Sequence, residues 1–255
     1  MTRYFTLPYD SGQRGLRMGA GPLHLVEKLG VEAEEIAPAS PFPAEIRTSF
    51  ELYRALAVRV AASDEFPVIL SGHCGASIGA AAGLGVDDLA ILWFDAHGDY
   101  NTPDTTDTGF LDGMCLAVAT GRCWRGPAAT IPGFAPVDPR RVVHVGSRDY
   151  SPGEREALVR DGVRMGADFD GLDATRMLVH VDLDVIDSRY GRANHFACEG
   201  GLSPDEVLGV IEEARSRFTI AGLVIASYDP SCDEDGRIAD AAVRIVSALS
   251  PSLSG

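Results

Sequence analysis

Three ionisable side chains follow directly on an apolar run near the middle of this chain. The run Leu89–Phe94 leads into Asp95, His97 and Asp99, within the stretch WFDAHGDYN. If the chain stays extended, residues at positions i, i+2 and i+4 point to the same side. Carboxylates held this close repel each other, and one takes up a proton unless a positive charge lies among them. The stretch therefore predicts a bound positive charge at the end of a strand.

A second acidic motif, LVHVDLDVID, also ends an apolar run. Asp182 and Asp184 share one face of an extended chain, and Asp187 follows them. A single Asp-x-His or Asp-x-Asp is usually a turn or a capping group. Two such motifs, each after a strongly apolar run, favour a site for divalent cations such as Mn²⁺ or Mg²⁺. The many carboxylates favour a pair of ions, which would generate hydroxide from water near neutral pH.

The elements that must position these motifs are apolar runs of strand length, which alternate with stretches of helical character. The expected strands are Phe66–Ser71, Leu89–Phe94, Arg141–Gly146, Met177–Asp184 and Gly222–Ser227. The expected helices are Pro152–Asp161 and Pro204–Phe218, and Ser203 and Glu206 have the spacing of a capping box at the start of the second. The alternation indicates an α/β fold with a mostly parallel sheet covered on both faces.

Further residues that can bind a metal or a substrate follow the other runs. His73 and Cys74 come after Phe66–Ser71, and Ser227 and Asp229 lie at the end of the last run. In parallel sheets, sites form just beyond the carboxyl ends of the strands. We therefore expect these side chains to meet the two acidic motifs in one site.

Length and composition predict a single domain over residues 1–255. The formal net charge of −15 argues against nucleic acid and anionic membranes as partners. No apolar run approaches the roughly 20 residues needed to span a bilayer. The opening residues, MTRYFTLPYDSGQRG, lack the hydrophobic stretch of a signal peptide. The five cysteines form no CxxC pair, so a reducing, cytoplasmic location is expected.

These motifs resemble those of the ureohydrolases, the family of arginase, agmatinase and formiminoglutamase. FDAHGDYNTPDTTDTG is similar to the family's Asp-Ala-His-x-Asp-x-Asn signature and the loop after it. HVDLDVID is similar to its Ser-x-Asp-x-Asp-x-x-Asp signature. The segments SGQRGLRMGAGPLHL, VGSRDYSPGE and GGLSPDE resemble other parts of the family. The likeness runs in order over nearly the whole chain.

The resemblance implies a three-layer α/β/α domain around a mostly parallel, eight-stranded sheet, with two Mn²⁺ ions as cofactors. Asp95 and Asp182 would contact both ions. His97 and Asp184 would complete one metal site, and Asp99 would serve the other. It also implies a small-molecule substrate and a homo-oligomer, either a trimer or a hexamer.

Other family roles fall on residues around the expected ions. Asp184 would also align the attacking hydroxide by accepting a hydrogen bond from it. Asn101 and Thr108 lie where the family holds the polar end of its substrate.

Two departures from the family pattern concern the metals and the proton. The usual Gly-Gly-Asp-His-Ser loop reads SGHCG here, so Cys74 falls on the histidine ligand and His73 on the residue before it. A thiolate is softer than an imidazole and suits a carboxylate-rich Mn²⁺ site poorly. Asp112 takes the place of the family's proton-shuttling histidine and would carry the proton instead, although its unperturbed pKa is much lower.

Two further departures concern the substrate. Ser227 stands where the family has a glutamate that binds the guanidinium, and Asp229, two residues on, is the expected substitute. Ser151 replaces an acidic residue that meets the amino group of the substrate. Loss of a carboxylate removes the charge partner of a guanidinium.

The leading hypothesis is a binuclear-metal hydrolase that cleaves a non-peptide C–N bond in a linear amidine or guanidine other than arginine. Hydroxyarginine is one candidate substrate. The alternative is a catalytically impaired arginase-like protein with a metal-binding, structural or regulatory role. Metal content separates the two hypotheses, because only the first needs a pair of bound ions.

Overall fold

A computed structural model describes residues 1–40 and 44–250 of the chain. Its centre is an eight-stranded sheet with the order β4-β1-β5-β10-β9-β6-β7-β8. All neighbouring strands in this sheet run parallel. The strands are β1 (Thr2–Leu7), β4 (Glu34–Glu35), β5 (Phe66–Ser71), β6 (Leu89–Phe94), β7 (Val142–Val145), β8 (Arg164–Met165), β9 (Arg176–Asp182) and β10 (Thr219–Ala226).

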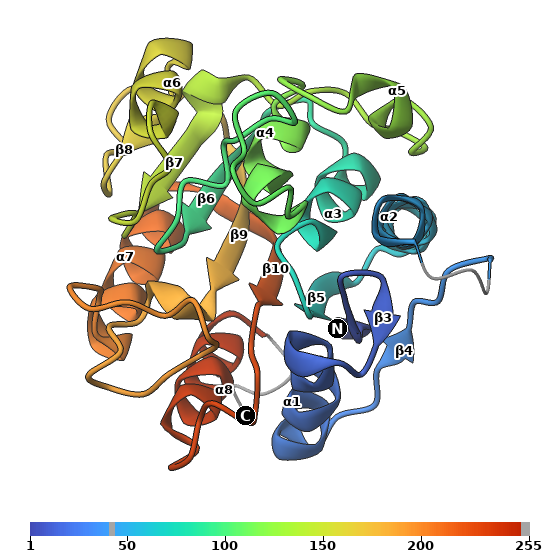
Figure 1. Cartoon of the computed structure of the whole chain (residues 1–255), viewed down its shortest axis with the longest axis vertical. Helices are drawn as coiled ribbons and strands as arrows, with labels where there is room; N and C mark the ends of the chain where they lie inside the picture. The colour runs from blue at the N-terminus through green and yellow to red at the C-terminus, as the bar shows by residue number, and fades with distance from the viewer. Residues whose placement is uncertain (41–43, 251–255) are drawn as a thin grey trace.

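Helices cover both faces of the sheet, which confirms the three-layer α/β/α architecture (Figure 1). One face packs against α2 (Glu45–Ala61), α3 (Ala76–Leu84), α4 (Cys115–Ala119) and α6 (Glu154–Asp161). The other packs against α1 (Gly21–Leu29), α7 (Pro204–Arg217) and α8 (Arg237–Leu249). Successive residues of β6 divide between the two cores, since Ile91 belongs to the first and Leu92 to the second. This alternation is what a strand buried on both faces requires.

The remaining elements are short. A small antiparallel hairpin is formed by β2 (Tyr9–Asp10) and β3 (Gln13–Arg14). Further short elements are η1 (Arg17–Ala20), η2 (Asp112–Met114), α5 (Arg125–Ala128), η3 (Pro139–Arg141) and η4 (Leu183–Val185). Within the described residues, no helix is long and apolar enough to cross a membrane.

Most expected strands and both expected helices are present. β5 and β6 match their expected bounds, and β7, β10 and α6 differ by a few residues at their ends. The capping box of Ser203 and Glu206 is confirmed at the start of α7. Strand β1 and the two-residue strands β4 and β8 were not expected from the apolar runs.

The expected strand Met177–Asp184 was wrong at its end. β9 ends at Asp182, and the chain then turns into the 3₁₀ element η4. The Asp182 side chain accepts a hydrogen bond from the Asp184 amide at 2.8 Å, which favours the turn over further extension. Asp182 and Asp184 therefore do not share one face of a continuous strand.

Candidate active site

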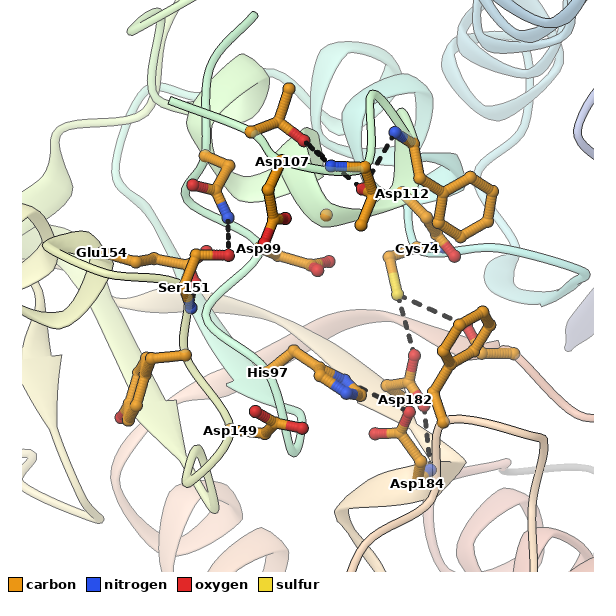
Figure 2. Close-up of a pocket in the computed structure, with 18 of the residues that line it drawn as sticks. Cys74, His97, Asp99, Asp107, Asp112, Asp149, Ser151, Glu154, Asp182 and Asp184 are labelled. Atoms are coloured by element: carbon orange, nitrogen blue, oxygen red, sulfur yellow. Dashed lines mark hydrogen bonds and ion pairs between the residues drawn. The ribbon is translucent and has the colours of Figure 1, made fainter. Parts of the chain in front are cut away.

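The central strands β5, β10, β9 and β6 end around a pocket of about 340 Å³. Figure 2 shows side chains from the segments after these strands pointing toward one another. The expected site residues that line the pocket are Cys74, His97, Asp99, Asn101, Thr108, Asp112, Ser151, Asp182, Asp184 and Ser227. Asp95 lies beneath them, with 1% of its surface exposed. The sheet thus brings together residues that lie far apart in the sequence.

One half of the site, which we call the His97 half, consists of His97, Asp95 and Asp184. The Nδ1 atom of His97 lies 3.3 Å from Asp95 Oδ1 and 3.4 Å from Asp184 Oδ2. Burial alone would lower the pKa of His97, but the two carboxylates raise it well above its usual value. Burial would likewise raise the pKa of Asp184, but the charge of His97 outweighs it and lowers the pKa to about 2. His97 and Asp184 therefore form an ion pair, whereas burial raises the pKa of Asp95.

The other half, which we call the Cys74 half, consists of Cys74, Asp182, Asp99 and Asp112. The thiol of Cys74 lies 3.0 Å from Asp182 Oδ2, and its backbone amide donates to Asp112 Oδ1 at 2.7 Å. Burial raises the pKa values of all four groups, and that of Asp112 reaches about 8. The described residues that line the pocket include no lysine or arginine. This half therefore lacks a protein cation of its own.

The donor atoms of both halves fit divalent metal ions. Asp99 Oδ2 is buried and has no hydrogen-bond partner among the described residues, although it lies in a carboxylate-rich cluster. An unpaired buried carboxylate oxygen is costly unless a proton or a cation satisfies it. Two groups of residues place their donor atoms within 4.8 Å of one another: Asp95, His97 and Asp184, and Cys74, Asp99 and Asp112. Carboxylates and an imidazole suit Mn²⁺, and Cys74 adds one softer donor.

Residues 13–250 match the Arginase family. The chain belongs to this family. Members of the family are hydrolases of C–N bonds other than peptide bonds, and they depend on a binuclear metal centre, typically of Mn²⁺. Family membership confirms the resemblance on which the expectations for the fold and the enzyme class rested.

Relatives named as arginases and as an amidinohydrolase align with most of this chain. Arginase from Bacillus subtilis is 28% identical, with 95% of each chain covered. The N(omega)-hydroxy-L-arginine amidinohydrolase of Streptomyces lavendulae is 30% identical, with 89% of this chain and 87% of its own covered. A crystal structure of the Bacillus subtilis arginase superposes with a TM-score of 0.84 and 26% identity over 98% of each chain.

The structure turns His73 and Asp229 away from the pocket of this arginase-family chain. His73 Nδ1 lies 3.3 Å from the Tyr53 hydroxyl and 3.7 Å from Asp112 Oδ1, so its ring packs behind Asp112. Asp229 Oδ1 accepts hydrogen bonds from the amide and the hydroxyl of Ser231, which hold the carboxylate in a local turn. Neither residue is among those that line the pocket. Cys74 therefore lines the pocket whereas His73 does not, and the Asp229 carboxylate is held outside the pocket lining.

Two polar residues that the sequence patterns did not indicate support the site. Glu154 accepts hydrogen bonds from the amides of Tyr100 at 2.8 Å and Ser151 at 3.0 Å, and so ties two pocket loops together. Asn194 donates to Asp184 Oδ2 at 3.3 Å and to the Ser227 carbonyl at 2.8 Å. Glu154 is the first residue of α6, and a carboxylate at the start of a helix that follows a strand could have indicated a site residue. Asn194 lies in a loop without a recognisable pattern.

Two phenylalanines form the rim of the pocket. The rings of Phe110 and Phe196 stack with their centroids 6.0 Å apart, and Phe196 meets the His97 ring edge-on at 6.4 Å. Phe196 is 49% exposed, so this apolar surface faces solvent at the mouth of the pocket. A substrate therefore passes an apolar rim before it reaches the carboxylates.

Two site residues are among those with a left-handed backbone conformation. Asp99 has φ of 50° and Ser227 has φ of 63°, both in the left-handed region that most side chains avoid. Such conformations cost about 1–3 kcal/mol each and persist where surrounding contacts hold them. At Ser227 the contact is with Asn194, which donates to its carbonyl.

Proposed function

We propose that this chain is a binuclear-metal amidinohydrolase whose substrate is a small guanidine or amidine less basic than arginine. The observation that carries the proposal is the pair of neighbouring metal-ligand groups at a pocket lined by Ser227. By the family resemblance, Ser227 stands where a glutamate would bind the guanidinium. The Streptomyces lavendulae relative acts on N(omega)-hydroxy-L-arginine by its name. A hydroxyguanidine is less basic than a guanidine, so hydroxyarginine is the first substrate to test.

The metal ligands are assigned from the two halves of the site. Asp95 and Asp182 would contact both ions, because each also meets the opposite half. Asp95 Oδ2 lies 3.9 Å from Cys74 Sγ, and Asp182 Oδ1 accepts from the Asp184 amide at 2.8 Å. His97 and Asp184 would complete one site, and Asp99 and Cys74 would serve the other. When bound, two Mn²⁺ ions lower the pKa of water so that hydroxide forms near neutral pH.

Two aspartates have further roles in the proposed reaction. Asp184 accepts a hydrogen bond from the attacking oxygen and aligns it, while Asn194 and Ala96 hold the carboxylate in place. Burial raises the pKa of Asp112 to about 8, so its carboxyl group can keep a proton at neutral pH. Asp112 lines the pocket and would deliver that proton to the departing nitrogen.

The substrate is bound through neutral polar groups as well as carboxylates. Asn101 Nδ2 donates to Ser151 Oγ at 3.1 Å, and both side chains line the pocket with Thr108. Asp149 adds a carboxylate to this wall (Figure 2). A zwitterionic amino-acid end would thus meet hydrogen-bond donors for its carboxylate and carboxylates for its ammonium group, while the reacting end meets Ser227.

Turnover and metal content test the proposal together. The purified protein, saturated with Mn²⁺, would be assayed for urea or ammonia release from hydroxyarginine, arginine, agmatine and other guanidino and amidino compounds. We expect about two bound ions per chain and turnover of at least one compound, with hydroxyarginine preferred to arginine. No bound metal would favour the alternative of an impaired protein. Bound metal without turnover of any compound would favour a metal-binding structural or regulatory role.

We also propose that the chain forms a homo-oligomer, because enzymes of the arginase family commonly do. A trimer or a hexamer is the expected assembly. Sedimentation equilibrium of the Mn²⁺-loaded protein would measure its mass, and a monomer would contradict the proposal.

A further inference from the structure

A third group of metal-binding side chains lies outside the proposed binuclear centre. His195, Asp229 and Cys232 place their donor atoms within 4.8 Å of one another. Asp229 is 3% exposed, Cys232 is partly buried, and His195 faces solvent. The three residues belong to two segments, one between β9 and α7 and the other between β10 and α8 (Figure 1). The Asp229 amide donates to the Ala193 carbonyl at 2.7 Å, so the segments are in direct contact.

We infer that His195, Asp229 and Cys232 form a separate Zn²⁺ site. A thiolate, an imidazole and a carboxylate are the donor types that Zn²⁺ prefers, in contrast to the carboxylate-rich centre in the pocket. Three protein donors leave a fourth tetrahedral position for water. With neutral His195, the thiolate and carboxylate carry two negative charges that one Zn²⁺ ion offsets. The site shares no residue with the proposed Mn²⁺ ligands.

The turn that contains Asp229 orients the donors before any metal binds. The amide and the hydroxyl of Ser231 donate to Asp229 Oδ1 at 2.9 and 2.7 Å. Both hydrogen bonds from Ser231 go to Oδ1, which leaves Oδ2 of Asp229 available to a cation. The Cys232 amide donates to the Asp229 carbonyl at 3.0 Å, and this turn brings the thiol back beside the carboxylate. Hydrogen bonds that fix a ligand in this way are typical of metal sites.

A Zn²⁺ ion here would fasten one wall of the substrate pocket. His195 lies between Asn194 and Phe196, which both line the pocket, and Asp229 lies two residues after Ser227. The metal would join the two segments at a point that is otherwise held by backbone and Asn194 hydrogen bonds. The strained Ser227 backbone and the Phe196 rim would then be held in place by one ion. The ion would therefore act on the pocket by holding these two segments together.

Protection of Cys232 from alkylation tests the site directly. The Mn²⁺-loaded protein would be treated with iodoacetamide with and without one equivalent of Zn²⁺, and each cysteine would be followed by peptide mass spectrometry. We expect Zn²⁺ to slow alkylation of Cys232 by roughly ten-fold or more, because a metal-bound thiolate is not free to react. Cys198 has similar exposure and should react at the same rate in both samples. Equal alkylation of Cys232 with and without Zn²⁺ would overturn the inference.

Substitutions at the other donors separate a metal effect from a general change in reactivity. His195→Ala should abolish the protection, whereas His24→Ala, at another exposed histidine, should preserve it. Ser231→Ala removes one hydrogen bond to Asp229 and should weaken Zn²⁺ binding by roughly 10- to 100-fold. Protection that persists in His195→Ala, or that is lost equally in His24→Ala, would contradict the site. Because the readout is resolved by cysteine, Zn²⁺ that enters the pocket at Cys74 is recognised separately.

Discussion

The two halves of the active site use similar carboxylates but balance their charge differently. In the His97 half, an imidazole lies within 3.4 Å of both Asp95 and Asp184 and can carry a positive charge. In the Cys74 half, the corresponding contact is a thiol 3.0 Å from Asp182, and a thiol can only be neutral or negative. Without metal, the first half is an ion pair and the second must hold protons.

This difference means that the two halves depend on metal to different degrees. Asp184 stays ionised beside His97, since its pKa is lowered to about 2. Asp99 and Asp112 have raised pKa values, because burial and neighbouring carboxylates disfavour their charged forms. A metal ion in the Cys74 half must displace protons, and one of its donors is softer than Mn²⁺ prefers. We therefore expect this half to bind Mn²⁺ more weakly.

The largest effect is expected at Asp182, which the proposal assigns to both ions. Asp182→Asn should remove most bound metal and abolish measurable turnover, because metal-assisted stabilisation of the transition state is worth several kcal/mol, or at least about a hundred-fold in rate. Metal analysis and steady-state kinetics would measure both losses. Asp187→Asn alters a carboxylate of the same motif outside the pocket and should keep its metal. Full metal content in Asp182→Asn would refute the shared role.

The next effect concerns substrate choice in the Cys74 half. Ser227 Oγ lies 3.5 Å from Cys74 Sγ, and Ser227→Glu would restore a carboxylate for a guanidinium. A charge-assisted pair of this kind is worth about 2–5 kcal/mol, so kcat/KM for arginine should rise by roughly 30-fold to several thousand-fold. Urea release would be compared with Ser227→Gln, which has the same length without the charge. Wild-type turnover of arginine on the order of tens per second would contradict our reading of Ser227.

A smaller effect is expected from restoring the family ligand in the Cys74 half. Cys74→His should tighten Mn²⁺ binding there on the order of ten-fold, or about 1.4 kcal/mol, because an imidazole suits Mn²⁺ better than a thiol does. Titration with Mn²⁺, followed by electron paramagnetic resonance, would resolve the weaker site. Affinity in the His97 half should not change. If the two metal sites of the wild type bound Mn²⁺ with equal affinity, the predicted weakness of the Cys74 half would be wrong.

A further effect is the pH dependence of the metal-free protein. The folded state raises the pKa of Asp112 from 3.8 to about 8, so it binds more protons than the unfolded state between these values. The contribution of Asp112 to the free energy of unfolding is fully present below its pKa in the unfolded state, and it is lost as the pH rises toward 8. Thermal unfolding of the metal-free protein should therefore shift to lower temperature from pH 5 to pH 8.

Asp112→Asn supplies the control for this pH dependence. It keeps the oxygen that accepts from the Cys74 amide but cannot titrate, so its melting temperature should depend less on pH. Bound Mn²⁺ should also reduce the dependence, because it replaces protons as the counter-charge. If the melting temperature of Asp112→Asn and of the Mn²⁺-loaded protein depended on pH as strongly as that of the metal-free wild type, the raised pKa values of the Cys74 half would not govern stability.

The sequence indicated the fold well where burial alone decides the local structure. Phe66–Ser71 and Leu89–Phe94 are continuous apolar runs, and both are strands with those bounds. In β1 the polar residues Thr2, Arg3 and Thr6 interrupt the apolar ones, and β4 and β8 contain only two residues each, so no apolar run marks these strands. Their pairing depends on neighbouring strands that the local sequence does not reveal.

The composition of the site was largely predictable, but the direction of several side chains was not. Residues at strand ends converge because a parallel sheet places those ends together. His73 and Asp229 have suitable chemistry and position, yet Tyr53 lies beside one and Ser231 turns the other away. Such hydrogen bonds join local turns to distant elements, so spacing in the sequence does not disclose them.

The position of β10 in the sheet has a consequence for how the protein matures. β10 follows every other described strand in the chain, yet it lies between β5 and β9. Until β10 has been synthesised, the facing edges of β5 and β9 have no partner in the native order and are open to wrong pairing. Ser227 and Asp229 also arrive only with this strand. Completion of the active site is therefore coupled to insertion of a late strand, and a nascent chain that stops earlier cannot assemble it.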